Sequence, residues 1–156
     1  MKINLMWGRG NPLSGYLNVD PHIYGVDGVS TGDVTNLDGY VNDSEATEIL
    51  ALDILDFLPL GIAGKALHNW VQKLRHGGKI VVGGTDIGLV CMMFSKKELD
   101  LTELNKIVHG EQTKGWDFKA SHLSMPELVE LLEGLGLKIL KKRHSKFQMS
   151  VEAQRQ

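Results

Sequence analysis

Short apolar runs alternate along this chain with longer stretches of helical period, and the alternation predicts an α/β layer structure. The expected strands are short, apolar and bounded by polar residues or glycine, as strands of a buried sheet are. They occupy residues 3–5, 16–19, 48–52, 79–82, 137–140 and 147–151, with a further short strand near Asp33 and Val34. The last two are joined by the basic run KKRHSK, which we interpret as a solvated hairpin turn.

Helices are expected where apolar residues recur every three or four positions. Residues 63–74 form one such stripe, which Gly77-Gly78 is expected to end, and residues 95–108 predict a second helix. Ser124 and Glu127 have the spacing of a capping box, and this predicts a third helix that ends at Gly136. Residues 109–122 have no clean period and predict a long loop.

Composition limits the function classes. A length of 156 residues favours a single domain over residues 1–156, and 42% hydrophobic with 23% charged residues is ordinary for a globular protein. The net charge of −2 gives no general attraction to nucleic acid or anionic lipid, and no apolar run approaches the ~20 residues of a membrane span. We therefore expect a cytoplasmic protein with neither partner. The single cysteine, Cys91, excludes an internal disulfide and a cysteine-rich zinc site, and we predict no metal.

The segment LMWGRGNPLSGYLNVD, at residues 5–20, carries candidate chemistry. Gly8 and Gly10 allow the backbone to approach a ligand closely, and Asp20 ends the next expected strand, where an acid can accept hydrogen bonds from ribose hydroxyls. Eleven residues separate Leu5 from Leu17, so any crossover helix there has one or two turns at most. Because no helix start is available for a pyrophosphate, the pattern indicates a ligand with a ribose and no phosphates.

Several segments, in order, resemble one family. INLMWGRGNPLSGYLNVDP is similar to the start of small class I S-adenosylmethionine-dependent methyltransferases of the type-11-like group. GDVTNL, EILALDILDFLP, ALHNWVQKLRHGGKIVVGGTD and SHLSMPELVELLEGLGLKI resemble later parts of those proteins, and the order holds over residues 3–140. The resemblance implies a Rossmann-like, doubly wound and mostly parallel sheet with an antiparallel C-terminal strand and a reduced first crossover helix. It implies S-adenosylmethionine as the cofactor.

The resemblance also implies site residues. The expected cofactor-binding set, at the turn and at strand ends, is Gly8, Gly10, Asp20, Asn36, Leu37, Asp38 and Asp53. A hydroxyl acceptor would need a general base, and the candidates are Asp56, Asp86, His109 and His122. The implied activity is methyl transfer to a small-molecule or glycan acceptor.

The sequence departs from the family at two important places. Met6 replaces the first family glycine, and Asp56-Phe57 replaces a Glu-His pair. These departures motivate an alternative, a non-catalytic relative that binds S-adenosylmethionine or another adenosine ligand. The chain also lacks the helices that precede the first strand in larger relatives, so a homodimer is expected to cover a thinly protected sheet face. Met92-Met93-Phe94 is interpreted as packing or as an oligomer contact.

Overall fold

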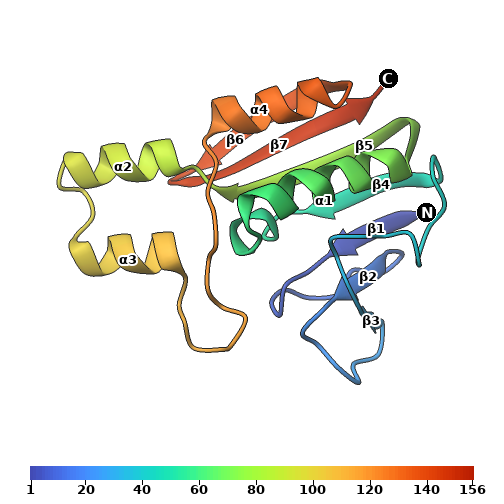
Figure 1. Ribbon diagram of the computed structural model, residues 1–156, viewed down its shortest axis with the longest axis horizontal. Coiled ribbons are helices and arrows are strands. Elements are labelled where there is room, and N and C mark those ends of the chain that lie inside the picture. The colour runs from blue at the N-terminus through green and yellow to red at the C-terminus, as the bar shows by residue number, and fades with distance from the viewer.

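The structure is a computed structural model that describes residues 1–156, and its seven strands form one sheet in the order β3-β2-β1-β4-β5-β7-β6. All strands run parallel except β7, which is antiparallel to both of its neighbours. The order runs outward in two directions from the β1–β4 pair, so the predicted Rossmann-like sheet is confirmed (Figure 1). The strands are β1 Lys2–Leu5, β2 Leu17–Asp20, β3 Val29–Thr31, β4 Ala46–Ala51, β5 Leu74–Thr85, β6 Leu137–Ser145 and β7 Gln148–Arg155.

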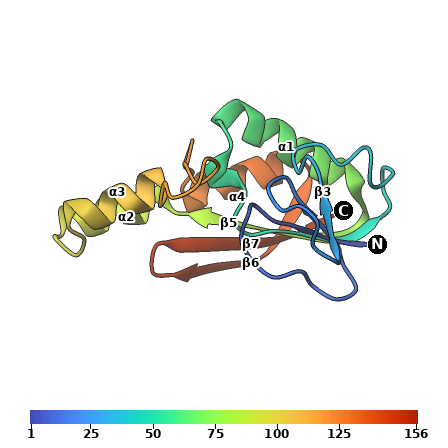
Figure 2. The same ribbon diagram turned by 90° about the horizontal axis from the view of Figure 1, so that it is seen from below.

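The helices cover one face of this sheet. Helices α1 (Leu60–Lys73) and α4 (Met125–Gly134) pack there, whereas α2 (Ile87–Ser95) and α3 (Leu101–His109) project beyond its end (Figures 1 and 2). None of the crossovers between β1, β2, β3 and β4 contains a helix, so the reduced first crossover is confirmed and the opposite face is free of helices. No helix is long and apolar enough to cross a lipid bilayer.

The core lies between the central strands and the two covering helices. Ile3, Ile49 and Ile80 from neighbouring strands are completely buried, as are the inward-facing leucines of α1 and α4. Trp70 of α1 is also fully buried, and its indole N–H donates to the Val34 carbonyl at 2.8 Å. This bond satisfies the only polar atom of the side chain and anchors the β3–β4 connection to α1.

Three predicted elements differ in the structure. The third strand lies before Asp33 and Val34, at Val29–Thr31, because Val29–Thr31 are the residues that pair with β2. Helix α1 ends at Lys73, before Gly77-Gly78, because Leu74 already pairs with Ala46 in the sheet. The run KKRHSK belongs largely to β6, and only its final lysine lies in the turn.

The helix predicted over residues 95–108 begins later in the structure, as α3 at Leu101, and α2 at Ile87–Ser95 was not predicted. Asp86 caps the start of α2 by accepting the backbone N–H groups of Gly88 and Leu89, and Asp100 and Glu103 form a capping box at the start of α3. The capping box predicted at Ser124 does not form, although Ser124 does precede the first residue of α4. Pro126 supports that helix start instead, since proline is favoured in the first turn.

Candidate functional site

The glycine turn and the predicted acid meet at the carboxyl edge of the sheet. Gly8 follows β1 with a positive φ of 69°, and its N–H donates to Oδ2 of Asp20 at 2.7 Å. The N–H of His22 donates to Oδ1 of the same carboxylate at 2.8 Å. Asp20 is completely buried, so these two charge-assisted bonds hold the turn and the end of β2 together. We call Gly8, Asp20 and His22 the cradle.

Aromatic side chains close the cradle. Trp116, from the loop after α3, lies over Gly8 so closely that a Cβ at residue 8 would overlap its indole. His22 stacks on Trp116 with ring centroids 5.0 Å apart and an angle of 10° between the rings. Trp7 packs edge-on against His22 and stacks on Phe57 at 5.8 Å.

A hydrogen bond and an ion pair also hold the loop that carries Trp116. The Trp7 indole N–H donates to the Trp116 carbonyl at 2.9 Å, and the Arg9 guanidinium forms an ion pair with Asp117. Within the cradle, Nε2 of His22 is buried and has no hydrogen-bond partner. Burial lowers the pKa of His22 despite the nearby Asp20 carboxylate, so this ring is neutral at pH 7.

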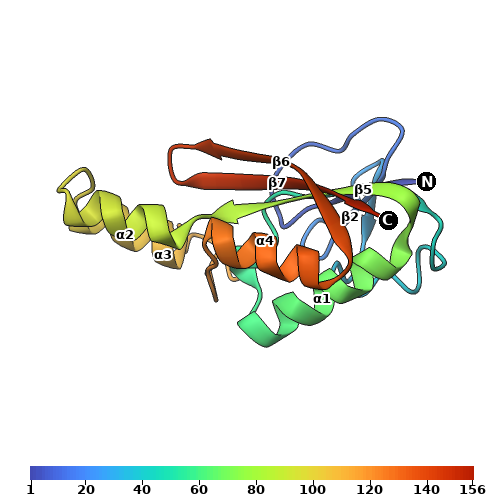
Figure 3. The same ribbon diagram turned by 90° about the horizontal axis from the view of Figure 1, so that it is seen from above.

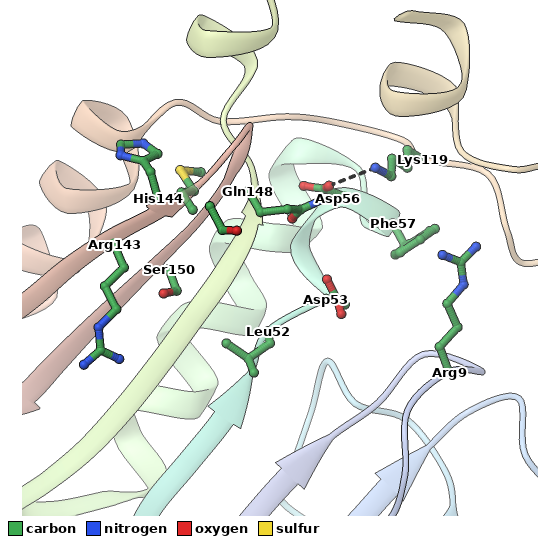
Figure 4. Close-up of a pocket in the computed structure, with 12 residues that line it drawn as sticks. Arg9, Leu52, Asp53, Asp56, Phe57, Lys119, Arg143, His144, Gln148 and Ser150 are labelled. Carbon is green, nitrogen blue, oxygen red and sulfur yellow. Dashed lines mark ion pairs between the residues drawn. The ribbon is translucent and has the colours of Figure 1, made fainter. Parts of the chain in front are cut away.

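An open cavity of about 620 Å³ lies beside the closed cradle, between the end of β4 and the β6–β7 hairpin (Figure 4). Asp53 and Asp56 point into it from the segment after β4, with Arg9 across from them. Most of its lining is polar or charged, namely Arg9, Asp53, Asp56, Lys119, Arg143, His144, Ser145, Gln148 and Ser150. Ligands of open α/β sheets bind at this edge.

Asp56 anchors the cavity wall. Its buried carboxylate accepts the Thr85 N–H at 3.1 Å and lies 3.5 Å from the Lys119 ammonium. Gly84 permits this approach, since a Cβ at that position would come within 2.7 Å of Oδ1. Burial alone would raise the pKa of Asp56, but the bonds and charges of His122, Thr85 and Lys119 outweigh it and lower the pKa. Asp56 is therefore ionised and fully engaged.

His122 completes this anchor. Its Nε2 lies 2.6 Å from the Val108 carbonyl and must carry a proton to donate there, while Nδ1 faces the Asp56 carboxylate at 3.7 Å. That distance is too long for a hydrogen bond, yet a charged ring is still favoured over a neutral one whose lone pair faces a carboxylate. Burial opposes the charge, but Asp56 and the Val108 carbonyl outweigh it and raise the pKa of His122.

Asp53 has no such partners. It is exposed in the large cavity and also lines a second cavity of about 210 Å³ beneath the glycine turn, together with Met6 and Gly10. Partial desolvation by the surrounding walls raises the pKa of Asp53, the nearby Asp56 carboxylate adds to this, and Lys119 and Arg9 oppose it. A carboxylate that is unpaired and has a raised pKa is a better proton acceptor than its anchored neighbour.

Asp86 also has a structural role, and it binds a residue that the sequence did not single out. While one carboxylate oxygen caps α2, the other lies 2.8 Å from Nε2 of His144 on β6. His144 and Arg143 line the cavity because β6 continues through them. The alternation of the buried Met149, Val151 and Ala153 indicated β7, but residues 141–145 of β6 are all exposed and gave no such signal.

The remaining predicted residues lie elsewhere. The N–H of Leu37 donates to the Asn69 side chain at 2.8 Å, and Asp38 binds Asn69 and Lys73. Asn36 contacts the same Asn69 amide, so this turn packs against the last half of α1, which leads back to the start of β5. The structure does not bring these residues to Gly8. His109 ends α3 and is exposed, and no group of three His, Cys, Asp or Glu side chains is arranged to hold a metal ion.

Comparisons with known proteins identify the fold. No family model and no curated protein matches the sequence. Among solved structures, the chain is similar to an S-adenosylmethionine-dependent methyltransferase from Methanosarcina mazei, with a TM-score of 0.64 and 15% identity over 99% of this chain and 92% of that one. It is similar to a methyltransferase of Thermotoga maritima described as a possible histamine N-methyltransferase, with a TM-score of 0.63 and 15% identity over 99% and 82% of the two chains.

A third similar structure is 1,6-didemethyltoxoflavin-N1-methyltransferase from Burkholderia thailandensis, with bound 1,6-didemethyltoxoflavin and S-adenosylhomocysteine. The TM-score is 0.60 at 13% identity, and 90% of this chain covers only 60% of that protein. These identities are low, but the strand order and the extent of the matches agree. The chain therefore has the fold of the class I S-adenosylmethionine-dependent methyltransferases.

Proposed function

We propose that this protein binds S-adenosylmethionine at the cradle and transfers its methyl group to a small polar acceptor in the adjoining cavity. The observation that carries the proposal is the 2.7 Å bond from the Gly8 N–H to the buried Asp20 carboxylate. It joins the glycine turn to an acid at the end of the next parallel strand, the arrangement that suits a ribose. When bound, the cofactor supplies a methyl group on a sulfonium.

The residues of the cradle fit an adenosine group. The Trp116 indole, a flat bicyclic ring, already lies against Gly8 and stacks on His22, so the cradle has the shape for a purine. Nε2 of His22 is a buried nitrogen without a partner, which a polar ligand would satisfy. Each Asp20 oxygen holds one backbone N–H and retains a lone pair for a ribose hydroxyl. Trp116 must leave before a ligand can enter.

The adjoining cavity suits a polar, hydroxylated acceptor such as a sugar. Nine of the twelve residues that line it are polar or charged, and they offer amide, hydroxyl, guanidinium and carboxylate groups. Asp53 lines both cavities and is the residue best placed to take the proton of an acceptor hydroxyl or amine. The anchored Asp56, Lys119 and His122 hold the wall in place, because binding and orientation supply much of the rate in a direct displacement.

Calorimetric titration with S-adenosylmethionine and S-adenosylhomocysteine tests the binding step. We expect Trp116→Ala to bind more tightly than the natural chain, by about 5- to 30-fold if the closed cradle is favoured by about 1–2 kcal/mol. Asp20→Asn should weaken binding. If neither the natural chain nor Trp116→Ala releases or absorbs heat with either compound, the cofactor assignment is wrong.

A second candidate is a non-catalytic relative with the same fold. The observations that favour it are the Trp116 indole inside the cradle and the buried Met6 where the resembled family has glycine. Transfer of a labelled methyl group to a panel of sugars and amines separates the two candidates. Turnover that falls by about 10²- to 10⁴-fold in Asp53→Asn supports the methyltransferase. Tight cofactor binding with no transfer to any acceptor supports the non-catalytic candidate.

A further inference from the structure

Helix α2 is apolar on nearly every side, yet most of it is uncovered. Its sequence is IGLVCMMFS, and only Val90 is buried. Together with α3 it forms an arm, residues 87–109, that projects beyond the end of the sheet (Figures 1 and 3). Met92, Phe94 and Leu101 are among the exposed large apolar side chains of the molecule. A helix that is apolar all round is normally buried, so the arm lacks a partner within its own chain.

An apolar groove lies on the helical face of the same molecule. It runs between α1 and α4, has a volume of about 570 Å³, and is walled by leucines that include Leu60, Leu67 and Leu131. Gly64 on α1 and Gly134 on α4 have no side chain, so another helix can approach the groove closely there. Leu60 and Leu131 are exposed, and the arm of the same chain points away from them (Figure 3).

Two lysines of the arm have the opposite charge to the acids of the groove. Glu127 and Glu130 are the only charged residues that line the groove. The tip of the arm carries Lys96 and Lys97 next to Phe94. Of the acids that follow, Glu98 is exposed directly after the lysines, and Asp100 and Glu103 are engaged with backbone N–H groups in the capping box of α3. Opposite charges at the rim of an apolar contact set its partner and register.

We propose that the arm docks into the α1–α4 groove of a second copy of this chain. Because each copy carries both the arm and the groove, a reciprocal exchange forms a closed two-fold dimer. The dimer buries the apolar residues of α2 and brings the arm lysines to the partner's groove acids. Met92-Met93-Phe94 then serves as the oligomer contact that its composition suggested.

The helix-free sheet face, where the sequence suggested a partner, is a weaker candidate. Its outward side chains alternate with the buried residues of the strands and include the ion pairs Lys2–Glu48 and Lys79–Glu152. A sheet face with these charged side chains can stay exposed to water without a partner. The proposed interface uses the face with exposed leucines.

Sedimentation velocity with matched variants is the first test. The natural chain should sediment as a dimer of the 17.3 kDa subunit. Phe94→Glu on the arm and Leu131→Lys in the groove should each raise the dimer dissociation constant at least tenfold with unchanged circular dichroism. Tyr24→Glu, at a side chain 76% exposed outside both surfaces, is the control and should leave the dimer intact.

Charge reversal sharpens the test. Lys96→Glu with Lys97→Glu should weaken the dimer, and Glu127→Lys with Glu130→Lys should weaken it similarly. All four substitutions together should restore it by recreating the pairs with opposite sign. Failure to restore, with both double variants monomeric, would argue against this pairing of surfaces.

Cross-linking then identifies the contact. Cys91, the single cysteine, is exposed on α2 and accepts a photoreactive maleimide. We expect cross-links to peptides of α1 or α4 in another copy, and none when the reagent is placed on Ser44→Cys in a Cys91→Ser background. A strictly monomeric natural chain, cross-links from arm to arm only, or transfer of the monomer to anionic lipid vesicles would each overturn the proposal.

Discussion

Two carboxylates near the same edge of the sheet have opposite surroundings. Asp20 is completely buried and binds two backbone N–H groups, and aromatic rings close the space above it. Asp53 lies exposed in a cavity, has a raised pKa and lines two cavities at once. In the proposed function, the first carboxylate holds the glycine turn in place and the second accepts a proton.

The difference shows that one edge of the sheet holds both a closed, hydrogen-bonded turn at Asp20 and an open cavity at Asp53. Three of its parallel crossovers lack helices, so the glycine turn is supported by Asp20 and by the Trp116 loop instead. The loop that supports the turn also occupies the space above it. In the proposed function, ligand entry at the cradle is therefore coupled to loop opening, while the proposed acceptor cavity is already open.

Asp20→Ala should have the largest effect on stability. It leaves the buried N–H groups of Gly8 and His22 without an acceptor, at about 1–3 kcal/mol each. Urea unfolding followed by circular dichroism measures the loss, and Asp20→Asn, which keeps one acceptor oxygen, should lose less. Equal stability of Asp20→Ala and the natural chain would remove the structural role.

Asp56→Asn and Asp53→Asn should separate the anchor from the proton acceptor. Asp56→Asn removes the charge that Lys119 and His122 face, and should lower the free energy of unfolding by about 1–3 kcal/mol. Asp53→Asn should stay within about 0.5 kcal/mol of the natural chain, since no partner is lost. The reverse order in urea unfolding would show that the two roles are exchanged.

The pH dependence of stability should report the anchor. The raised pKa of His122 means that its contribution is complete below pH 6.5 and is lost as the pH rises through the folded-state pKa. The lowered pKa of Asp56 means that its contribution is present above pH 3.8 and is lost as the pH falls through its folded-state value. Urea midpoints measured between pH 6 and 9 should fall in the natural chain and much less in His122→Gln. A parallel decline in both would assign the dependence to other groups.

Arg9→Gln should have the smallest effect. Arg9 pairs with Asp117 to hold the Trp116 loop, but its side chain is 49% exposed and solvent screens the pair. We expect a stability change below about 1 kcal/mol and a modest gain in affinity for S-adenosylhomocysteine, because the loop opens more easily. Calorimetry that finds weaker binding would instead assign Arg9 to the ligand.

Local signals made part of the site predictable. Gly8 and Asp20 lie within one strand–turn–strand unit, and their bond spans only twelve positions. Asp53 and Asp56 follow a short apolar run, which placed both at the carboxyl edge of the sheet. Their different roles depend on burial and on partners in β5 and the late loop, which no local pattern contains.

Long-range contacts account for what the sequence did not indicate. The bond between Trp7 and Trp116 joins residues 109 positions apart, and the only hint was a tryptophan inside the polar segment TKGWDFK. His144 reaches Asp86 across 58 positions, and its position depends on where the β6–β7 hairpin turns. The turn at Asn36–Asp38 was expected at the site, but its polar groups bind Asn69 and Lys73 at the far end of α1.

The most direct test follows the three indole N–H signals by ¹⁵N nuclear magnetic resonance during titration with S-adenosylhomocysteine. Trp116 covers the cradle, Trp7 donates to the Trp116 carbonyl, and Trp70 is bonded to Val34 in the core and serves as an internal control. We predict that the Trp116 and Trp7 signals shift with saturation while Trp70 stays fixed. Three unchanged signals at millimolar ligand would contradict cofactor binding at the cradle.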